Sequence, residues 1–219
     1  MPRLLFEKKG NAIWISHLDL MRLFQRAFKR AGLPLTHTQG FNPRPSVSIA
    51  LPLSVGVESQ CELLDFELYG DSFSYDEICT RLNSALVEGV HVLSVYGDCA
   101  KIKDIAYLDC GISLEYDTCI PQGAEESILS LFSKPEIIME KRSKNGIKEE
   151  NIIPMIRKLV ISRVDENVLQ IFARVCCQNP SLNPLQIPAA IEKYLPEYKP
   201  DFSKCIRYEI YDTKEKIFR

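Results

Sequence analysis

The sequence feature that most constrains the fold is an amphipathic helix near the N-terminus, "SHLDLMRLFQRAFKRAG" (Ser16–Gly32). Ser16 is a favourable N-cap and Asp19 follows three residues later, where a carboxylate stabilises the first turn. Gly32 supplies the left-handed residue that commonly ends a helix. The residues that recur at helical spacing between these ends are Leu20, Phe24, Ala27, Phe28 and Ala31. One face of this helix is therefore apolar and needs a core to pack against.

Strand-like segments flank this helix, and a second helix follows them. Alternation of apolar and polar residues is typical of half-buried strands. The expected strands are Arg3–Gly10, with or without a continuation through Ala12–Ile15, then Ser46–Leu53, Cys61–Tyr69 and Gly89–Gly97. The second helix is expected after Ser74, with Glu77 completing a capping box. The resulting order is β-α-β-β-α-β, which is that of a ferredoxin-like domain.

The second half of the chain repeats this order with added strands. The expected elements are a strand at Ala106–Tyr116, a helix at Ala124–Ser133, a hairpin at Glu136–Ile153 turning at Asn145–Gly146, a second hairpin at Lys158–Val175, a helix from Asn183 to about Leu195, and a strand at Cys205–Asp212. The sequence therefore predicts an α+β protein of two tandem ferredoxin-like domains, residues 1–99 and 100–219. The second domain carries the extra hairpin, and the boundary falls near Gly97–Asp104.

The formal net charge of −2 conceals a strong asymmetry along the chain. Residues 1–50 hold eight Lys and Arg against two acids, and residues 51–100 hold one against nine. The acidic stretch 58–77 is a candidate docking surface for a basic partner. No apolar run approaches the roughly 20 residues that span a bilayer, and no secretory signal is recognisable, so we expect a cytoplasmic protein without membrane contact.

Eight cysteines are spread along the chain without any CxxC pair. Structural zinc and iron–sulfur sites draw their ligands from such short spacings, so we expect neither a metal nor another cofactor. The P-loop, GxGxxG, GxSxG and HExxH motifs are also missing from the sequence. The CxxxCxxC motif of radical SAM enzymes is missing too, so the chain is not itself such an enzyme.

The first helix carries a positive stripe opposite its apolar face. Its members are Arg22, Arg26, Lys29 and Arg30, spaced i, i+4, i+7 and i+8. Such a stripe attracts phosphate groups when its charges are unpaired. The alternative is a solvated outer face whose charges pair with acids from residues 58–77. The sequence leaves both interpretations open.

The loop after this helix, "HTQGFNPRPS" (His37–Ser46), combines stiffness with polar groups. Gly40 can adopt a positive φ, while Pro43 and Pro45 restrict the backbone, so the loop loses little entropy on binding. Phe41 either plugs the core or provides a surface on which a base stacks. Further donors and acceptors come from His37, Gln39, Asn42 and Arg44.

His17 is the candidate for catalysis, because it occupies the first position of the helix, where backbone N–H groups attract anions. It could serve as the general base of a metal-independent RNA endonuclease. Arg22 or Arg44 would then stabilise the phosphate. This is the alternative to a binding protein that has no catalytic role.

The run Ser16–Leu68 resembles the radical SAM-linked family of uncharacterised proteins, DUF2344. The matching positions are Ser16, His17, Asp19, Arg22, Phe24, Arg26, Gly40 to Pro43, Pro45, Gly56, Ser59, Glu62 and Asp65. Members of this family occur fused to, or encoded beside, radical SAM proteins, often near genes for ribonuclease G and ribosomal proteins. The resemblance implies an accessory protein that binds RNA, or presents an RNA- or ribosome-linked substrate, to a radical SAM partner. The basic helix and the Gly40–Pro45 loop would make the contacts.

Overall fold

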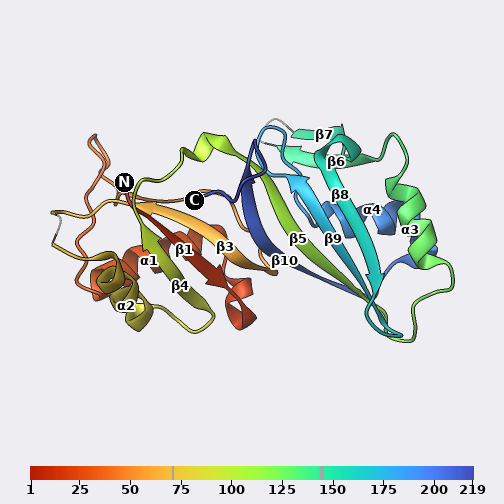
Figure 1. Cartoon of the computed structure of the whole chain (residues 1–219), viewed down its shortest axis with the longest axis horizontal. Coiled ribbons are helices and arrows are strands. Elements are labelled where there is room, and N and C mark those ends of the chain that lie inside the picture. The colour runs from red at the N-terminus through yellow and green to blue at the C-terminus, as the bar shows by residue number, and fades with distance from the viewer. Residues whose placement is uncertain (71, 144–145) are drawn as a thin grey trace. The chain divides into compact units, whose positions relative to one another are not determined.

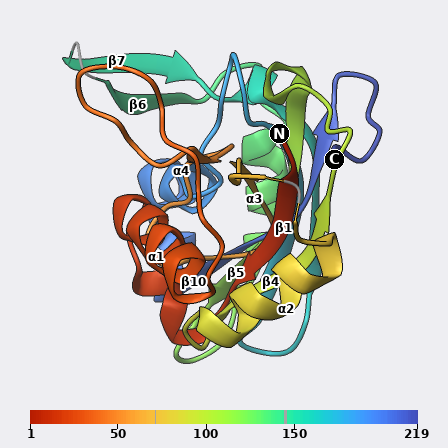
Figure 2. The ribbon, with the colours of Figure 1, turned by 90° about the vertical axis from the view of Figure 1, so that its left-hand side faces the viewer.

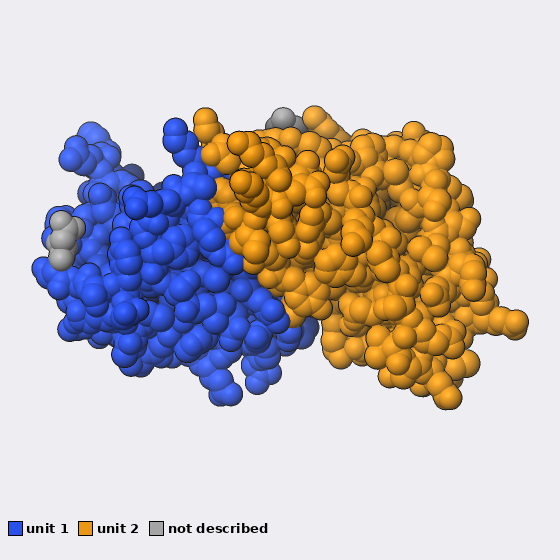
Figure 3. Space-filling model, in the orientation of Figure 1, with its two compact units in different colours: residues 1–102, 219 blue, residues 103–218 orange. Residues whose placement is uncertain are grey.

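The computed structural model describes residues 1–70, 72–143 and 146–219 (Figure 1). It is a mixed α+β protein built on antiparallel strand pairs, which confirms the predicted class. The chain divides into two compact units, Met1–Ile102 with Arg219, and Lys103–Phe218 (Figure 3). The division therefore falls three residues later than expected, and the last residue belongs to unit 1. None of the described helices is long and apolar enough to cross a membrane.

Unit 1 follows the expected order of strands and helices. Its elements are β1 (Arg3–Lys8), the 3-10 helix η1 (Gly10–Trp14), α1 (His17–Arg30), β2 (Val47–Ile49), β3 (Val57–Phe66), α2 (Tyr75–Ala85) and β4 (Val90–Tyr96). The strands pair antiparallel in the order β4-β1-β3-β2. Both helices lie on one side of these strands (Figure 2), and their buried residues share one core with alternate residues of β1, β3 and β4. In α1 the buried residues are Leu20, Phe24, Ala27 and Phe28, as expected.

The chain between β1 and α1 differs from expectation. The continuation of the strand through Ala12–Ile15 is wrong, because these residues form η1 and the turn that leads into α1. Gly10 adopts a φ of 55°, which favours glycine, and Ile15 donates its N–H to the carbonyl of Ala12. The buried ammonium group of Lys8 donates to the carbonyl of Ile15 at 2.9 Å. The chain therefore bends at once after β1 instead of continuing as a strand.

Unit 2 contains its own set of antiparallel strands and a separate hairpin. Its elements are η2 (Ile102–Asp104, at the boundary), β5 (Ile105–Glu115), α3 (Ala124–Phe132), β6 (Ile138–Ser143), β7 (Gly146–Asn151), η3 (Ile153–Met155), β8 (Ile156–Arg163), β9 (Val168–Cys176), α4 (Gln186–Tyr194), η4 (Pro196–Tyr198) and β10 (Phe202–Asp212). The sheet order is β10-β5-β9-β8, and β6 pairs with β7. The hairpin agrees with the prediction, whereas its turn at Asn145 lies outside the described residues.

The last helix starts later than expected. Asn183 does not cap it directly, because its side-chain oxygen accepts from the N–H of Leu185 at 3.2 Å and stabilises a turn before the helix. The helix begins at Gln186, with Leu185 as its N-cap. Asn183 followed by Pro184 therefore marks the turn that precedes the helix.

A buried ion pair joins β1 to β3 in unit 1. Arg3 stands opposite Asp65 in the strand register, and its Nε and Nη2 atoms donate to the two carboxylate oxygens at 2.6 and 3.2 Å. The Arg3 side chain is only 2% exposed. A charge so removed from water depends on its counter-ion, since isolated buried charges are strongly unfavourable.

We predict that Asp65→Asn lowers the free energy of unfolding by about 3 kcal/mol, because the Arg3 guanidinium loses its counter-charge. Urea denaturation followed by circular dichroism measures the change. The matched control is Glu88→Gln, an exposed acid of the same unit, which should change stability by less than about 0.5 kcal/mol. Equal stability of the two variants would contradict a structural role for this pair.

Candidate nucleic-acid interface

The first turn of α1 is fixed by a local cap. The N–H of Asp19 donates to the Ser16 hydroxyl oxygen at 3.2 Å, and that hydroxyl donates to the Asp19 carboxylate at 2.7 Å. The hydrogen bond from Ser16, and then the Arg22 guanidinium, hold the pKa of the Asp19 carboxyl below its usual value. Ser16 and Asp19 therefore both have a structural role. The cap sets where the helix begins and thus which residues face outward.

The four cations of the predicted stripe are all exposed, but they differ in their partners. Arg22 forms an ion pair with Asp19 at 2.8 Å, and Arg30 donates to the carbonyl of Ala85 at 2.5 Å. Within the described part of the chain, the side chains of Arg26 and Lys29 form no hydrogen bond or ion pair. Both partners of the Arg22 pair are exposed, so that pair is weak and a phosphate could compete for Arg22. The strongest candidates for phosphate contact are therefore Arg26 and Lys29.

The acids of residues 58–77 do not neutralise this helix in the described residues. Glu62 is fully buried and accepts from the Ser59 hydroxyl at 2.7 Å. Glu67 accepts from the Thr36 hydroxyl at 2.7 Å, and Glu77 pairs with Arg81. The stretch is therefore not one continuous acidic surface, because several of its carboxylates serve contacts inside the unit.

The loop after α1 is a narrow excursion closed at its base by backbone hydrogen bonds. Thr38 donates its N–H to the Arg44 carbonyl at 2.8 Å, and the N–H of Arg44 donates to the Thr38 hydroxyl at 3.0 Å. Ser46 donates its N–H to the carbonyl of Thr36 at 2.8 Å. These bonds hold the tip away from the core while leaving its side chains in solvent.

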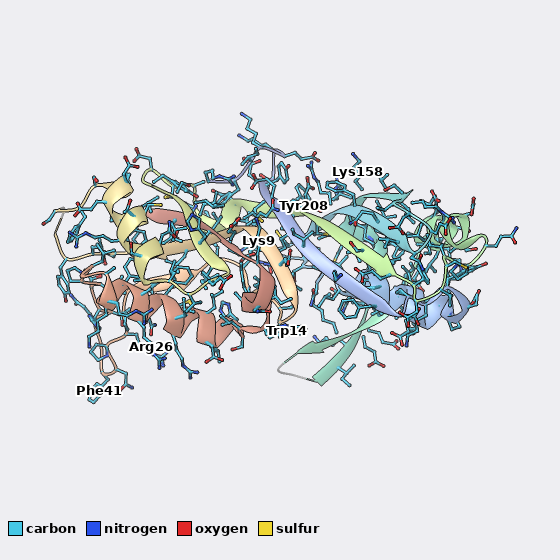
Figure 4. All side chains as sticks on the ribbon, turned by 90° about the horizontal axis from the view of Figure 1, so that it is seen from below. Lys9, Trp14, Arg26, Phe41, Lys158 and Tyr208 are labelled. Carbon is cyan, nitrogen blue, oxygen red and sulfur yellow. The ribbon has the colours of Figure 1, made fainter. Side chains whose placement is uncertain are left out.

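Phe41 stands at the tip of this excursion and is fully exposed. The interpretation of Phe41 as a core plug is therefore wrong. Asn42 and Arg44 are exposed as well. In Figure 4, Phe41 extends away from the ribbon, and Arg26 lies on the same side of the unit. An aromatic ring is thus presented to solvent on the side of the unit that carries the unpaired charge of Arg26.

The exposure of Trp14 was not predicted from the sequence. Trp14 ends η1, is 64% exposed, and its ring lies against Gly56, where an added Cβ would come within 3.5 Å of the ring. Leu18 is exposed beside the start of α1. Gly10, four residues earlier, and the N-cap at Ser16 are the signals that could have indicated a turn here. Trp14 and Leu18 are thus two exposed apolar side chains near the N-terminal end of the basic helix.

His17 is half-buried at the first position of α1. Its Nδ1 atom is shielded from solvent and has no hydrogen-bond partner in the described structure. A general base must reach the proton that it removes, so only Nε2 could act on a substrate. A catalytic base is commonly oriented by a hydrogen bond to a third group. Among the described residues, the His17 imidazole has no such hydrogen bond.

A hollow of unit 1 lies apart from His17 and the predicted RNA-binding residues. This cavity of about 520 Å³ lies at the start of α2, lined in part by Glu67, Leu68, Phe73, Tyr75 and Ile78. Its described lining includes Glu67 of the acidic stretch 58–77 but none of the predicted catalytic or RNA-binding residues. Among the described residues, no three His, Cys, Asp or Glu side chains gather as metal ligands. The candidate site is accordingly an open surface on α1 and the loop.

These features define a two-unit α+β protein with an exposed basic helix and an aromatic loop. The chain belongs to the family described as "Uncharacterized protein conserved in bacteria (DUF2344)", whose model matches residues 2–184. The match extends well beyond the run Ser16–Leu68 that carries the recognisable motif. No curated protein matches the chain.

Solved structures give a likeness of fold. One is a chain of the "Crystal Structure of a Cbf5-Nop10-Gar1 Complex", with 7% sequence identity, a TM-score of 0.52, and coverage of 95% of this chain and 48% of that chain. This chain thus spans about half the length of that structure. Another is an unknown protein from Galdieria sulphuraria, with 10% identity over 94% of this chain and 95% of that chain. Its TM-score is 0.26.

We predict that Phe41→Ala changes the free energy of unfolding by less than about 0.5 kcal/mol, because the ring contacts solvent rather than the core. The matched aromatic control is Phe24→Ala in the same unit, which should cost about 3 to 5 kcal/mol because Phe24 is fully buried. Urea denaturation measures both variants. Comparable losses would restore the core-plug interpretation.

Proposed function

We propose that this protein is a non-catalytic accessory protein that binds RNA through α1 and the Gly40–Pro45 loop and works with a radical SAM enzyme. RNA binding is supported by the exposure of the Phe41 ring on the same side of the unit as Arg26, a cation without an acidic partner among the described residues. Lys29, three residues further along α1, adds a second such cation. Cations bind the phosphate backbone and an exposed ring stacks on an unpaired base, so single-stranded RNA fits this surface better than a duplex.

The radical SAM partner is proposed from the family resemblance and not from the RNA-binding surface. The run Ser16–Leu68 resembles proteins that are fused to, or encoded beside, radical SAM proteins, and the chain lacks the cluster-binding CxxxCxxC motif. A radical SAM partner would supply the chemistry, and this protein would supply binding. The radical SAM partner would contact unit 1 at the exposed apolar side chains of Trp14 and Leu18.

We also propose that each unit is a ferredoxin-like domain, so that the chain is a tandem of two. The strand orders β4-β1-β3-β2 and β10-β5-β9-β8, each with two helices in the β-α-β-β-α-β sequence, support this assignment. The β6–β7 hairpin would then be an insertion between the first helix and the second strand of the second domain. Ferredoxin-like scaffolds serve many functions, so the function must be argued from the surface and not from the fold.

The RNA proposal is tested by fluorescence anisotropy with a labelled single-stranded RNA at several salt concentrations. We predict that Arg26→Glu with Lys29→Glu weakens binding at least tenfold. Because two phosphate contacts are lost, the slope of log affinity against log salt concentration should become less steep by about 0.7 for each contact. The control is Lys134→Glu with Lys148→Glu, which makes the same charge change at exposed positions just after α3 and in β7. The control should bind RNA as the wild type does.

Two outcomes would contradict this proposal. One is RNA binding that is absent or insensitive to salt in the wild type. The other is an equal loss of affinity in the control, because a general charge effect would then explain the result. The same reactions, resolved on a gel, test the endonuclease alternative. RNA cleavage by the wild type that disappears in His17→Ala would favour catalysis over binding.

The partner proposal is tested by co-purification with the radical SAM protein encoded nearest to this chain's gene. We predict a complex that Trp14→Ser weakens, since the ring is exposed and its loss leaves the core intact. The control is Ile147→Ser, which removes an exposed apolar side chain from β7 of unit 2. A wild-type protein that elutes alone in size-exclusion chromatography with the purified enzyme would refute the partnership while leaving the RNA proposal standing.

A further inference from the structure

One face of the unit 2 sheet is not used by its core. Residues directly opposite each other in antiparallel strands point to the same face, so the register defines the set. Val160 pairs with Phe172, Phe172 pairs with Gly111, and Gly111 pairs with Ile206. Their neighbours in the strands, such as Ile171 and the other buried residues of β9, point to the opposite face. We call the face that carries Phe172 the open face; it is turned toward the viewer in Figure 1, with α4 behind the strands.

Two aromatic rings are stacked on the open face. The rings of Phe172 and Tyr208 have centroids 6.3 Å apart and planes inclined by only 15°. Tyr208 falls at the register shift between Arg207 and Glu209, where the strand has one residue more than its partner. Tyr208 is 38% exposed, so part of this aromatic surface faces solvent.

A glycine allows the tyrosine ring to lie across the sheet. A Cβ added to Gly111 would come within 2.7 Å of the Tyr208 hydroxyl oxygen and 2.8 Å of its ring. Such distances are far below normal contact, so any other residue would displace the ring. Gly111 therefore leaves room for the Tyr208 ring, which covers its backbone.

Unpaired positive charge gathers beside these rings on the edge strand β8. Lys158 is exposed, with its Nζ atom 5.9 Å from the centroid of the Phe172 ring. Arg157, which is exposed, lies over the Tyr107 ring at 5.6 Å. Within the described residues, neither of these two cations has an acidic partner.

Other cations of the open face, unlike those of β8, are neutralised by acidic partners. Arg174 donates to both oxygens of Asp109, at 2.7 and 2.9 Å, and to Glu215 at 3.0 Å. Lys204 pairs with Glu115 at 2.6 Å. The available positive charge of the open face therefore lies along β8, next to the aromatic pair.

We propose that the open face of unit 2 is a stacking platform for single-stranded nucleic acid. A base stacks on the Phe172–Tyr208 surface while the β8 cations follow the phosphates. Ser113 pairs with Gln170, two residues before Phe172, so both lie on the open face. The Ser113 hydroxyl donates to Gln170 at 2.7 Å, and the two side chains offer polar atoms to the edge of a base. Charged residues on an edge strand oppose its pairing with another protein's strand, so nucleic acid fits better than a peptide. This site lies in unit 2 and does not depend on the α1 interface.

The test uses the full chain with labelled ten-nucleotide oligouridine RNA, the matching oligothymidine DNA, and a duplex RNA of equal length. Phe172→Leu keeps an apolar side chain but removes the π-face, and it should weaken single-strand binding about tenfold. Gly111→Ala should cause a similar loss by displacing Tyr208. Lys158→Glu should lower the salt slope by about 0.7. The control is Tyr69→Leu, an exposed aromatic of unit 1, which should bind as the wild type does.

Wild-type affinity in both Phe172→Leu and Gly111→Ala, with the fold intact by circular dichroism, would overturn the proposal. Duplex RNA bound as tightly as the single strand would also overturn it, because paired bases cannot stack on a side chain. Preference for RNA or for DNA in the single-strand arms assigns the ligand. A loss in Arg26→Glu with Lys29→Glu but not in Phe172→Leu would support the α1 interface and refute this one, so the two failures are distinguishable.

Discussion

The candidate surface of unit 1 depends on the hydrogen bond from the Lys8 ammonium group to the carbonyl of Ile15. Lys8 ends β1 and is fully buried, and Ile15 immediately precedes the N-cap of α1. A buried ammonium group requires acceptors, so the chain after β1 must return to it. This return produces η1, exposes Trp14 and directs α1 back along the strands. The outward face of α1, which carries Arg26, is oriented by that constraint.

The family motif contains residues with two different roles. Ser16, Ser59, Glu62 and Asp65 make contacts inside unit 1, as a helix cap, a buried hydroxyl–carboxylate bond and an ion pair between strands. Gly56 adopts a φ of 81°, which glycine adopts readily. These residues are explained by folding alone. The exposed members of the motif, above all Arg26 and the loop tip, have no such explanation, and the binding proposal is built on them.

The two proposed surfaces combine aromatic rings with unpaired cations in different ways. In unit 1 a single ring, Phe41, projects from a loop whose base is closed by hydrogen bonds. In unit 2 the stacked rings of Phe172 and Tyr208 come from two strands, and Gly111 leaves room for Tyr208. A projecting ring can enter a gap between bases, whereas a ring pair on a sheet supports a base from one side. Single-stranded nucleic acid suits both arrangements, since its bases are free to stack.

The sequence by itself determined the features that depend on near neighbours. The caps at Ser16 and Ser74, the buried stripe of α1 and the alternation along β9 follow from contacts a few residues apart, and all are present in the structure. The tertiary structure alone decided which charges are paired and which rings are exposed. Arg3 meets Asp65 across 62 positions of the chain, and Phe41 is exposed because the base of its loop closes elsewhere. A helix cap depends on the local backbone. The partner of a side chain depends on which distant segment the fold places beside it, and no local sequence pattern encodes that pairing.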